Sequence, residues 1–235
     1  VGMSGSDYHQ TIVMPGVLKM LELKPGRRVL DLACGQGVFS RFLLEKKIKP
    51  EGLDSSEELL RMARSRSVKS ISYHLGNAGD AKILNGQEFD GIACLLAVQN
   101  IEKIEPVFKN VARWLKPKGK FVMVLTHPCF RIPRQTHWGW DEGKKIEYRR
   151  VDRYANEMKI PILTPPFIDK VNFTMTYHRP LQNYFSALLK AGLYVDSLEE
   201  WMSNKESVSG KRSRGENRAR KEVPLFMAIR AVRSC

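Results

Sequence analysis

The 235-residue sequence lacks several features that would assign it to a common class of protein. No apolar run approaches the ~20 residues that a membrane-spanning helix requires, and residues 1–10 lack the basic-then-apolar pattern of a signal peptide. The cysteines do not fall at the spacing of metal-ligand pairs, and a chain of this size is not expected to need a disulfide framework. They are Cys34, Cys94, Cys129 and Cys235. We therefore expect no membrane association, no metal, free thiols and a cytoplasmic location.

The net charge of +14 is unevenly distributed. Residues 205–221 carry seven lysines and arginines against two glutamates, which makes this stretch a candidate contact for phosphate groups. The same stretch contains no aromatic residue that could stack on a base. We therefore expect a solvated, mobile hairpin tip. Nucleic acid stays open as a partner but is not favoured.

Hydrophobic residues make up 43% of the chain, which is enough for a globular domain with a substantial core. Apolar runs alternate with segments of helical periodicity, and the runs predict strands at residues 29–32, 49–53, 71–75, 89–96 and 120–126. This alternation is typical of a parallel sheet with helices on both faces. The sequence therefore predicts an α/β, doubly wound, mostly parallel sheet in a single domain, 1–235, with a helical cap at 1–25.

The alternation ends after residue 126. Residues 127–179 show no regular period and are rich in aromatic residues and proline, so we expect an irregular insertion at 127–180 that covers the substrate. A helix is predicted at 180–191, and strands at 194–201 and 223–232 complete the chain.

The first strand ends in a turn with two glycines, Gly35 and Gly37, just before a helix. Such a turn lets the backbone approach a ligand and offers the free N–H groups of the helix. A nucleoside triphosphate site would need Gly-Lys-Ser/Thr after the turn, which is absent. A dinucleotide site would need a small residue near Phe39. Three ligands suit such a turn: a nucleoside triphosphate, a dinucleotide and S-adenosylmethionine. The missing features argue against the first two.

Polar residues follow the next two strands. Asp54 closes the second strand, where a carboxylate can accept both hydroxyls of a ribose. Asn77 and Ala78 follow the third strand, where a short amide can face an adenine edge. Because carboxyl ends of parallel strands meet at one edge of the sheet, these residues and the glycine turn should lie together.

The motifs VLDLACGQGVFS, GLDSSEELLRMAR, GNAGD, FDGIACLLAVQNI and VARWLKPKGKFVMV together resemble those of class I S-adenosylmethionine-dependent methyltransferases. The resemblance covers residues 29–126 and implies a Rossmann-like, seven-stranded sheet whose last strand is antiparallel. It implies S-adenosyl-L-methionine as cofactor and S-adenosyl-L-homocysteine as product. The cofactor-binding residues that it implies are Asp31, Ala33, Gly35, Gly37, Asp54, Ser55, Asn77, Ala78, Leu96 and Ala97.

The family resemblance also assigns parts of the cofactor to these residues. Gly35 and Gly37 approach the methionine part, and Asp31 orders the turn near the amino group. Asp54 takes the ribose. Asn77 and Ala78 line the adenine, while Leu96 and Ala97 contact the cofactor through their backbone. Asn77 departs from the aspartate that the family often has, and Gln99–Asn100 replace the family's histidine or glutamate.

The sequence says less about the molecule that accepts the methyl group than about the cofactor. The segments HPCFRIPR, HWGWD and YHRPLQNYFSALLKAGL resemble a subgroup of small soluble methyltransferases, mostly of unassigned substrate. His127, Tyr177 and His178 are candidate bases, should the acceptor need one. We expect a small-molecule acceptor. The alternatives are an RNA methyltransferase that uses residues 205–221 and a non-catalytic, cofactor-binding regulatory protein. The oligomeric state stays open.

Overall fold

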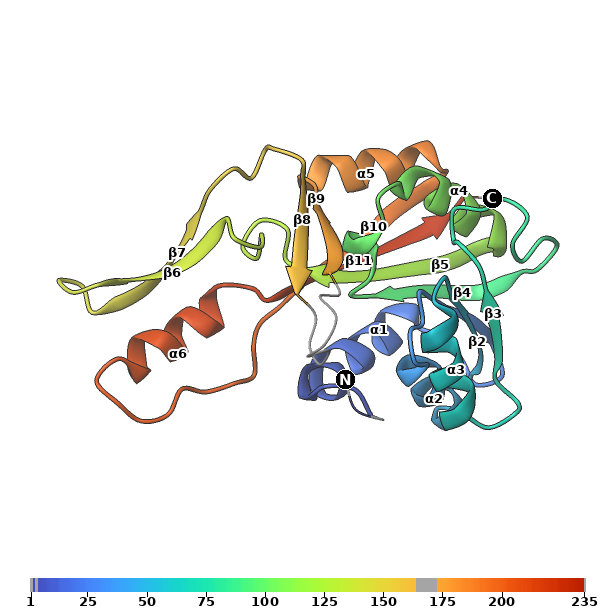
Figure 1. Ribbon diagram of the computed structural model, residues 1–235, viewed down its shortest axis with the longest axis horizontal. Coiled ribbons are helices and arrows are strands. Elements are labelled where there is room, and N and C mark those ends of the chain that lie inside the picture. Colours follow the sequence, from blue (N-terminus) through green and yellow to red (C-terminus); the bar gives the residue numbers. More distant parts are fainter. Residues whose placement is uncertain (1, 3, 164–172, 235) are drawn as a thin grey trace.

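The computed structural model describes residues 2, 4–163 and 173–234. At its centre is a seven-stranded sheet in the order β10-β11-β5-β4-β1-β2-β3 (Figure 1). Its strands in chain order are β1 (Arg28–Leu32), β2 (Lys49–Asp54), β3 (Ser72–Leu75), β4 (Phe89–Leu95), β5 (Leu115–Thr126), β10 (Leu193–Trp201) and β11 (Phe226–Arg233). β1 to β5 are parallel, and β11 runs antiparallel to both β5 and β10. The predicted fold class is confirmed.

The helices pack on both faces of this sheet. A π-helical turn, His9–Val13, continues into α1 (Met14–Leu21), and the helices that follow are α2 (Val38–Glu45), α3 (Glu57–Arg66), α4 (Ile104–Trp114) and α5 (Leu181–Lys190). α1 and α2 share a core with Val122 and Val124 of β5, whereas α4 and α5 share a core with Met123 and Leu125. Successive side chains of β5 therefore enter opposite cores, as expected for a strand that is covered on both faces.

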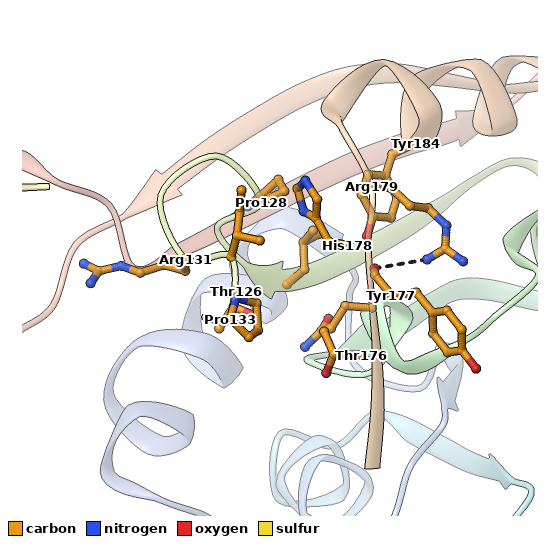
Figure 2. Close-up of a pocket in the computed structure, with 12 residues that line it drawn as sticks. Thr126, Pro128, Arg131, Pro133, Thr176, Tyr177, His178, Arg179 and Tyr184 are labelled. Atoms are coloured by element: carbon orange, nitrogen blue, oxygen red, sulfur yellow. Dashed lines mark hydrogen bonds between the residues drawn. The ribbon is translucent and has the colours of Figure 1, made fainter. Parts of the chain in front are cut away.

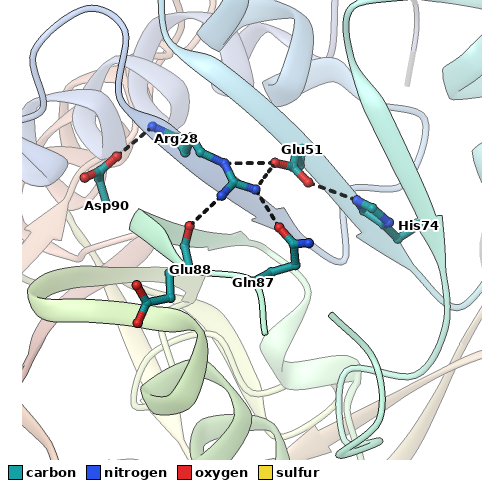
Figure 3. Close-up of polar contacts among 6 residues, drawn as sticks. All are labelled: Arg28, Glu51, His74, Gln87, Glu88 and Asp90. Carbon is teal, nitrogen blue, oxygen red and sulfur yellow. Dashed lines mark hydrogen bonds and ion pairs between the residues drawn. The ribbon is translucent and has the colours of Figure 1, made fainter. Parts of the chain in front are cut away.

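A polar network fixes the starts of the central strands, at the edge opposite the glycine turn (Figure 3). The Arg28 guanidinium donates to Glu51 Oε1 over 2.6 Å and to the Glu88 carbonyl oxygen over 3.0 Å. Its backbone N–H donates to Asp90 over 2.9 Å. His74 Nε2 lies 3.0 Å from Glu51 Oε2, and this hydrogen bond lowers the pKa of Glu51. The network joins β1, β2, β3 and β4 at their solvent-facing edge.

The insertion predicted at 127–180 follows β5 as expected, but its predicted irregularity is wrong, because most of the described residues of this segment form two β-hairpins. β6 (Thr136–Asp141) pairs with β7 (Ile146–Val151), and β8 (Met158–Leu163) pairs with β9 (Phe173–His178). Residues 164–172 of the predicted insertion lie outside the described residues. Each hairpin is a two-stranded ribbon, so both of its strands are edge strands and tolerate Pro161. Because of this proline and the many aromatic residues, the segment lacks the regular alternation of apolar and polar residues from which a strand is predicted.

The predicted hairpin tip at 205–221 is also wrong. Residues Ser213–Glu222 form helix α6, which packs beside β7 (Figure 1). Gly215 fits against the Trp140 ring, and Ala219 is buried. Arg218 and Glu222 form an ion pair one turn apart, at 2.7 Å. Good helix formers and this contact with β6 outweigh the repulsion among the basic side chains.

The free thiols expected at Cys34, Cys94 and Cys129 are confirmed, and Cys235 lies outside the described residues. Within the described parts of the chain, no helix is both long and apolar enough to cross a bilayer.

Candidate active site

The turn between β1 and α2 has an unusual backbone. Ala33, Gly35 and Gly37 have φ angles of 56°, 54° and 73°. A Cβ on Gly37 would lie 2.2 Å from the Tyr73 hydroxyl oxygen, whereas one on Gly35 would meet no atom within 4 Å. The backbone at Gly35 is therefore open to a ligand, while Gly37 is needed for the packing of the turn itself.

Asp54, the last residue of β2, holds this turn. Its Oδ2 accepts the backbone N–H of Gly35 over 2.7 Å, and its Oδ1 accepts the backbone N–H of Ser56 over 2.8 Å. Asp54 is 8% exposed. Each carboxylate oxygen has two lone pairs, so the group can still accept hydrogen bonds from two hydroxyls of a ribose.

Asp31 lies in β1 below the turn and is buried. Its Oδ2 accepts the Ser40 hydroxyl over 2.6 Å. Burial raises the pKa of Asp31 to about 7. The carboxyl group therefore changes its charge near neutral pH, and a bound ammonium group would favour the ionised form.

Two amide side chains fix the turn after β3. Asn77 Oδ1 accepts the backbone N–H of Gly79 over 2.8 Å. The side chain of Asn110 in α4 donates to the carbonyl oxygens of Ala78 and Asp80, over 2.8 and 3.0 Å. Asn77 and Ala78 are thus held at the carboxyl end of β3, beside the end of β2.

These strand ends enclose a cleft of about 250 Å³. The predicted cofactor residues that border it are Ala33, Asp54, Ser55, Asn77 and Ala78. An adjoining hollow of about 450 Å³ shares Asn77, Ile101 and Glu102 with it. The shared residues place the two hollows side by side, at the edge of the sheet where a doubly wound fold binds nucleotides.

The other predicted cofactor residues do not border this cleft: they are Asp31, Gly35, Gly37, Leu96 and Ala97. Gly35 is joined to it through Asp54. The sequence analysis missed Ile101 and Glu102, which do border it. Their position just after β4, at the same edge of the sheet, is the signal that could have identified them.

The chain after β4 brings a buried amide to this edge. Ala97 leads into one 3-10 turn, Val98–Asn100, which carries Gln99. Gln99 Nε2 donates to the Leu96 carbonyl oxygen over 2.9 Å, so the free end of the amide is its Oε1. That atom is buried and has no hydrogen-bond partner in the described part of the chain. An unmet acceptor is costly, and it marks Gln99 as a contact for a donor on a ligand.

Gln99 borders a second, small cavity of about 20 Å³, the acceptor cavity, beyond the ends of β4 and β5. Figure 2 shows Thr126 and Pro133 on one side of it and Thr176 and His178 of β9 on the other. Tyr177 borders both this cavity and the cofactor cleft, so the two spaces meet at that residue.

The β8–β9 hairpin is tied to the segment that follows β4. Thr176 Oγ1 donates to Asn100 Oδ1 over 3.1 Å, and Lys159 forms a 3.3 Å ion pair with Glu102. The Arg179 guanidinium donates to the Ile101 carbonyl oxygen over 2.8 Å. These contacts keep β9 against the edge of the cleft.

The candidate bases differ in their surroundings. His127 is buried, with Nε2 2.7 Å from Glu200 Oε1, and its Nδ1 accepts the Cys129 backbone N–H over 3.2 Å, so both ring nitrogens are engaged. His178 Nε2 donates to the Tyr154 carbonyl oxygen over 2.8 Å, which leaves Nδ1 unprotonated in the neutral ring. Burial lowers the pKa of both histidines. A catalytic role for either, or for Tyr177, stays a prediction.

The strand order and the cleft at the carboxyl ends define a doubly wound, nucleotide-binding domain. A family model described as a methyltransferase domain matches residues 29–119. The ubiquinone biosynthesis O-methyltransferase of Coxiella burnetii is 31% identical over 197 residues, 74% of this chain and 78% of that protein. The protein of the same name from Thiobacillus denitrificans is 32% identical over 97 residues, 40% of this chain and 42% of that protein. The solved structure of an S-adenosylmethionine-dependent methyltransferase from Mesorhizobium loti has a TM-score of 0.75 and 26% identity, covering 99% of this chain and 100% of that one.

The chain belongs to the class I S-adenosylmethionine-dependent methyltransferases, and S-adenosylmethionine is its cofactor. The residues present fit this cofactor. The open backbone at Gly35 and the free lone pairs of Asp54 suit an amino acid moiety and a ribose. The cleft and the adjoining hollow leave room for the nucleoside.

Proposed function

We propose that this methyltransferase acts on a small-molecule acceptor that presents an O–H or N–H group to Gln99. The observation that carries the proposal is the buried Oε1 of Gln99, which borders the acceptor cavity and accepts no hydrogen bond. Leaving such a group unmet costs about 1–3 kcal/mol, and a donor on the acceptor would recover it. The relatives named as O-methyltransferases support a hydroxyl as the donor.

We assign the cofactor residues the roles that the family resemblance implies. Asp31 faces the amino group, Asp54 holds the ribose hydroxyls, and Asn77 lies at the adenine edge. The backbone contacts come from Gly35, Gly37, Ala78, Leu96 and Ala97, and Ala33 and Ser55 line the cleft. The charge change of Asp31 near neutral pH and the lone pairs of Asp54 support the first two assignments.

The bound cofactor supplies a methyl group that its sulfonium has already activated for in-line displacement. The chain's contribution is alignment, which can lower a barrier by roughly 7–11 kcal/mol. In this proposal Gln99 Oε1 accepts a hydrogen bond from an O–H or N–H next to the reacting atom, while the proton of the reacting hydroxyl passes to His178 Nδ1. His178 is neutral and has an unprotonated Nδ1, so it is the favoured base for a hydroxyl acceptor. Tyr177 lies between the two spaces, since it borders both. We place the reaction in the cytoplasm, because free thiols suit a reducing compartment.

One observation favours the non-catalytic alternative, namely the small volume of the acceptor cavity, about 20 Å³. An acceptor can enter only if β9 moves away from Thr126 and Pro133. The Thr176–Asn100 hydrogen bond and the exposed Lys159–Glu102 ion pair are weak enough to break. Buried Arg179, which donates to the Ile101 and Glu102 carbonyl oxygens, would keep the end of β9 in place during this movement.

Transfer of a labelled methyl group from S-adenosylmethionine to panels of phenols, catechols and amines, and to total RNA, tests the proposal. Label on a small molecule is the expected result. Gln99→Met removes the free oxygen at similar volume and should lower kcat/KM at least tenfold, whereas Gln99→Glu keeps an oxygen and should retain more activity. S-adenosylhomocysteine affinity is the control and should not change. Label on RNA alone, or cofactor binding with no transfer, would contradict the proposal.

A further inference from the structure

Helix α6 and the β6–β7 hairpin form a lobe beside the central sheet (Figure 1). Residues of this lobe border a further cavity, distinct from the cofactor cleft and the acceptor cavity. Its volume is about 110 Å³. Two guanidinium-bearing residues, Arg131 and Arg220, border it together with Trp138. The hydroxyl residues Tyr8 and Ser203, joined by a 2.9 Å hydrogen bond, form another side.

The positive charge around this cavity is only partly offset, by the carboxylate of Glu147. Within the described residues, neither Arg131, Arg149 nor Arg220 forms an ion pair. The Nε of Arg220 is buried and has no hydrogen-bond partner. Burial and the neighbouring Arg149 charge lower the pKa of Arg131 to about 10. Partly buried guanidinium groups that lie close together without an ion-pair partner are unfavourable, so an anion would stabilise this arrangement.

Two of the arginines are held in place before any ligand binds. Arg131 donates from Nε to the Pro224 carbonyl oxygen over 3.1 Å, and Arg149 donates from Nε to the Phe130 carbonyl oxygen over 2.8 Å. Both guanidinium groups stack on the Trp138 ring, at 5.0 and 4.8 Å from its centroid. Such preorganisation reduces the entropy lost when an anion binds.

Among the residues that the structure describes, Glu147 is the only acid that borders the cavity. It forms no ion pair with the arginines, and burial together with the charge of Glu216 raises its pKa. Glu147 therefore offsets part of the arginine charge without pairing with any one arginine, and its own charge opposes an entering anion. Removing that charge should strengthen anion binding.

We propose that this cavity is a binding site for a phosphate group. Guanidinium groups bind phosphate oxygens through paired, charge-assisted hydrogen bonds, and a doubly charged anion matches the two arginines that border the cavity, with Arg149 close to Arg131. Arg131 borders both this cavity and the acceptor cavity, but Figure 2 shows its guanidinium pointing away from Thr126 and Pro133, so the charged end belongs to the cavity beside Arg220. The proposal does not depend on which acceptor the enzyme methylates.

The test is the affinity of the full chain for inorganic phosphate, measured by calorimetry and by the rise in melting temperature at constant ionic strength, with chloride as the reference salt. We expect saturable binding, a loss of at least tenfold in Arg220→Gln, and tighter binding by severalfold in Glu147→Gln. Arg218→Gln is the matched control, because it removes one charge from the same helix at an exposed position. Affinity for S-adenosylhomocysteine should be unchanged in all three variants, which shows that they fold.

Three results would overturn the proposal. Phosphate and chloride could have equal effects, which would leave only ionic screening. Arg218→Gln could lose as much affinity as Arg220→Gln, which would show a diffuse surface charge rather than a site. Glu147→Gln could bind phosphate no more tightly than the unchanged chain, which would place the anion away from this cavity.

Discussion

The carboxylate of Asp54 accepts a 2.7 Å hydrogen bond from the backbone N–H of Gly35. This contact joins the end of β2 to the turn after β1, although the two residues are 19 positions apart. The acid predicted to hold the ribose and the turn predicted to approach the methionine part are therefore one unit. A change at Asp54 should affect both parts of the cofactor site.

Replacing Asp54 by alanine should weaken S-adenosylhomocysteine binding at least tenfold. Hydrogen bonds to a charged group contribute roughly 1.5–3 kcal/mol, and 1.4 kcal/mol corresponds to a factor of ten. Asp54→Ala also leaves the Gly35 and Ser56 N–H groups without their acceptor, so the fold should lose stability as well. Calorimetry below the melting temperature of the variant measures the affinity.

The matched control is Glu58→Ala, which removes an exposed acid from the first turn of α3. This variant should bind the cofactor product as the unchanged chain does. Equal affinity in Asp54→Ala and Glu58→Ala would remove Asp54 from the site.

Three glycine variants separate backbone strain from ligand contact. Gly26, Gly35 and Gly37 all have positive φ, but only at Gly37 would a Cβ clash, with Tyr73. Gly26→Ala and Gly35→Ala should each lose about 1–2 kcal/mol of unfolding free energy from the left-handed backbone, and Gly37→Ala should lose more. Gly35→Ala should also lose cofactor affinity, whereas Gly26→Ala should keep it. Urea unfolding and calorimetry on the same preparations measure both quantities.

If Gly26→Ala weakened cofactor binding as much as Gly35→Ala, the loss would come from general destabilisation. The open space beside Gly35 would then have no role in binding.

The pKa of Asp31 predicts a pH dependence of stability. Burial raises it from 3.8 to about 7, so between these values the folded chain holds a proton that the unfolded chain has lost. The unfolding free energy should therefore fall as pH rises through this window, by up to about 1.4 kcal/mol per unit, and level off above pH 7. Asp31→Asn has no such titration. The difference in unfolding free energy between this variant and the unchanged chain should therefore shift in favour of the variant as pH rises from 5 to 8.

The same group should couple pH to cofactor binding. An ionised Asp31 attracts the ammonium group of S-adenosylmethionine, so affinity should rise severalfold between pH 6 and pH 8 and stay flat in Asp31→Asn. A pH profile that is identical in the two proteins would show that Asp31 does not titrate at the cofactor.

Most of the central fold could be predicted because its signals are local. The β4 segment, 89–95, is almost wholly apolar, and Ser56 caps α3 by accepting the Leu59 N–H over 3.3 Å. The two hairpins and α6 could not be predicted in this way. They are stabilised by contacts between distant segments, such as Gly215 against the Trp140 ring, which no local period records.

The residues at the cleft were predictable where they end or follow a strand: Asp54 ends β2, Asn77 follows β3, and both border the cleft. Gln99 was noted only as a departure from the family pattern. Its importance depends on an absence of hydrogen bonds around Oε1, and only the folded structure shows that absence. The Nε2 of His127 is engaged because β10 brings Glu200 beside it, which is again a long-range contact.

The last prediction concerns α6 and separates small-molecule from RNA substrates. The absence of aromatic residues at 205–221 argued against RNA, but the fold places the Trp140 ring under Arg212, at 5.1 Å, and leaves Tyr148 49% exposed on the neighbouring hairpin. The lobe thus combines basic and aromatic groups, as sites for single-stranded nucleic acid do. RNA binding therefore needs a direct test.

The test variant changes four exposed residues of this segment to glutamine: Lys211, Arg212, Arg214 and Arg218. If they contact RNA phosphates, affinity for RNA should fall with salt by a log–log slope of about −0.7 per contact, and the variant should flatten that slope and lose RNA methylation. We expect instead that the variant keeps its cofactor affinity and its activity on a small acceptor, and loses only weak retention on nucleic acid. Exposed ion pairs such as Arg212–Glu142 contribute at most about 1 kcal/mol, so the fold should survive.

The charge-matched control changes four exposed lysines elsewhere to glutamine: Lys46, Lys49, Lys69 and Lys118. Salt-sensitive RNA binding that disappears in the α6 variant but not in this control would make RNA the leading substrate.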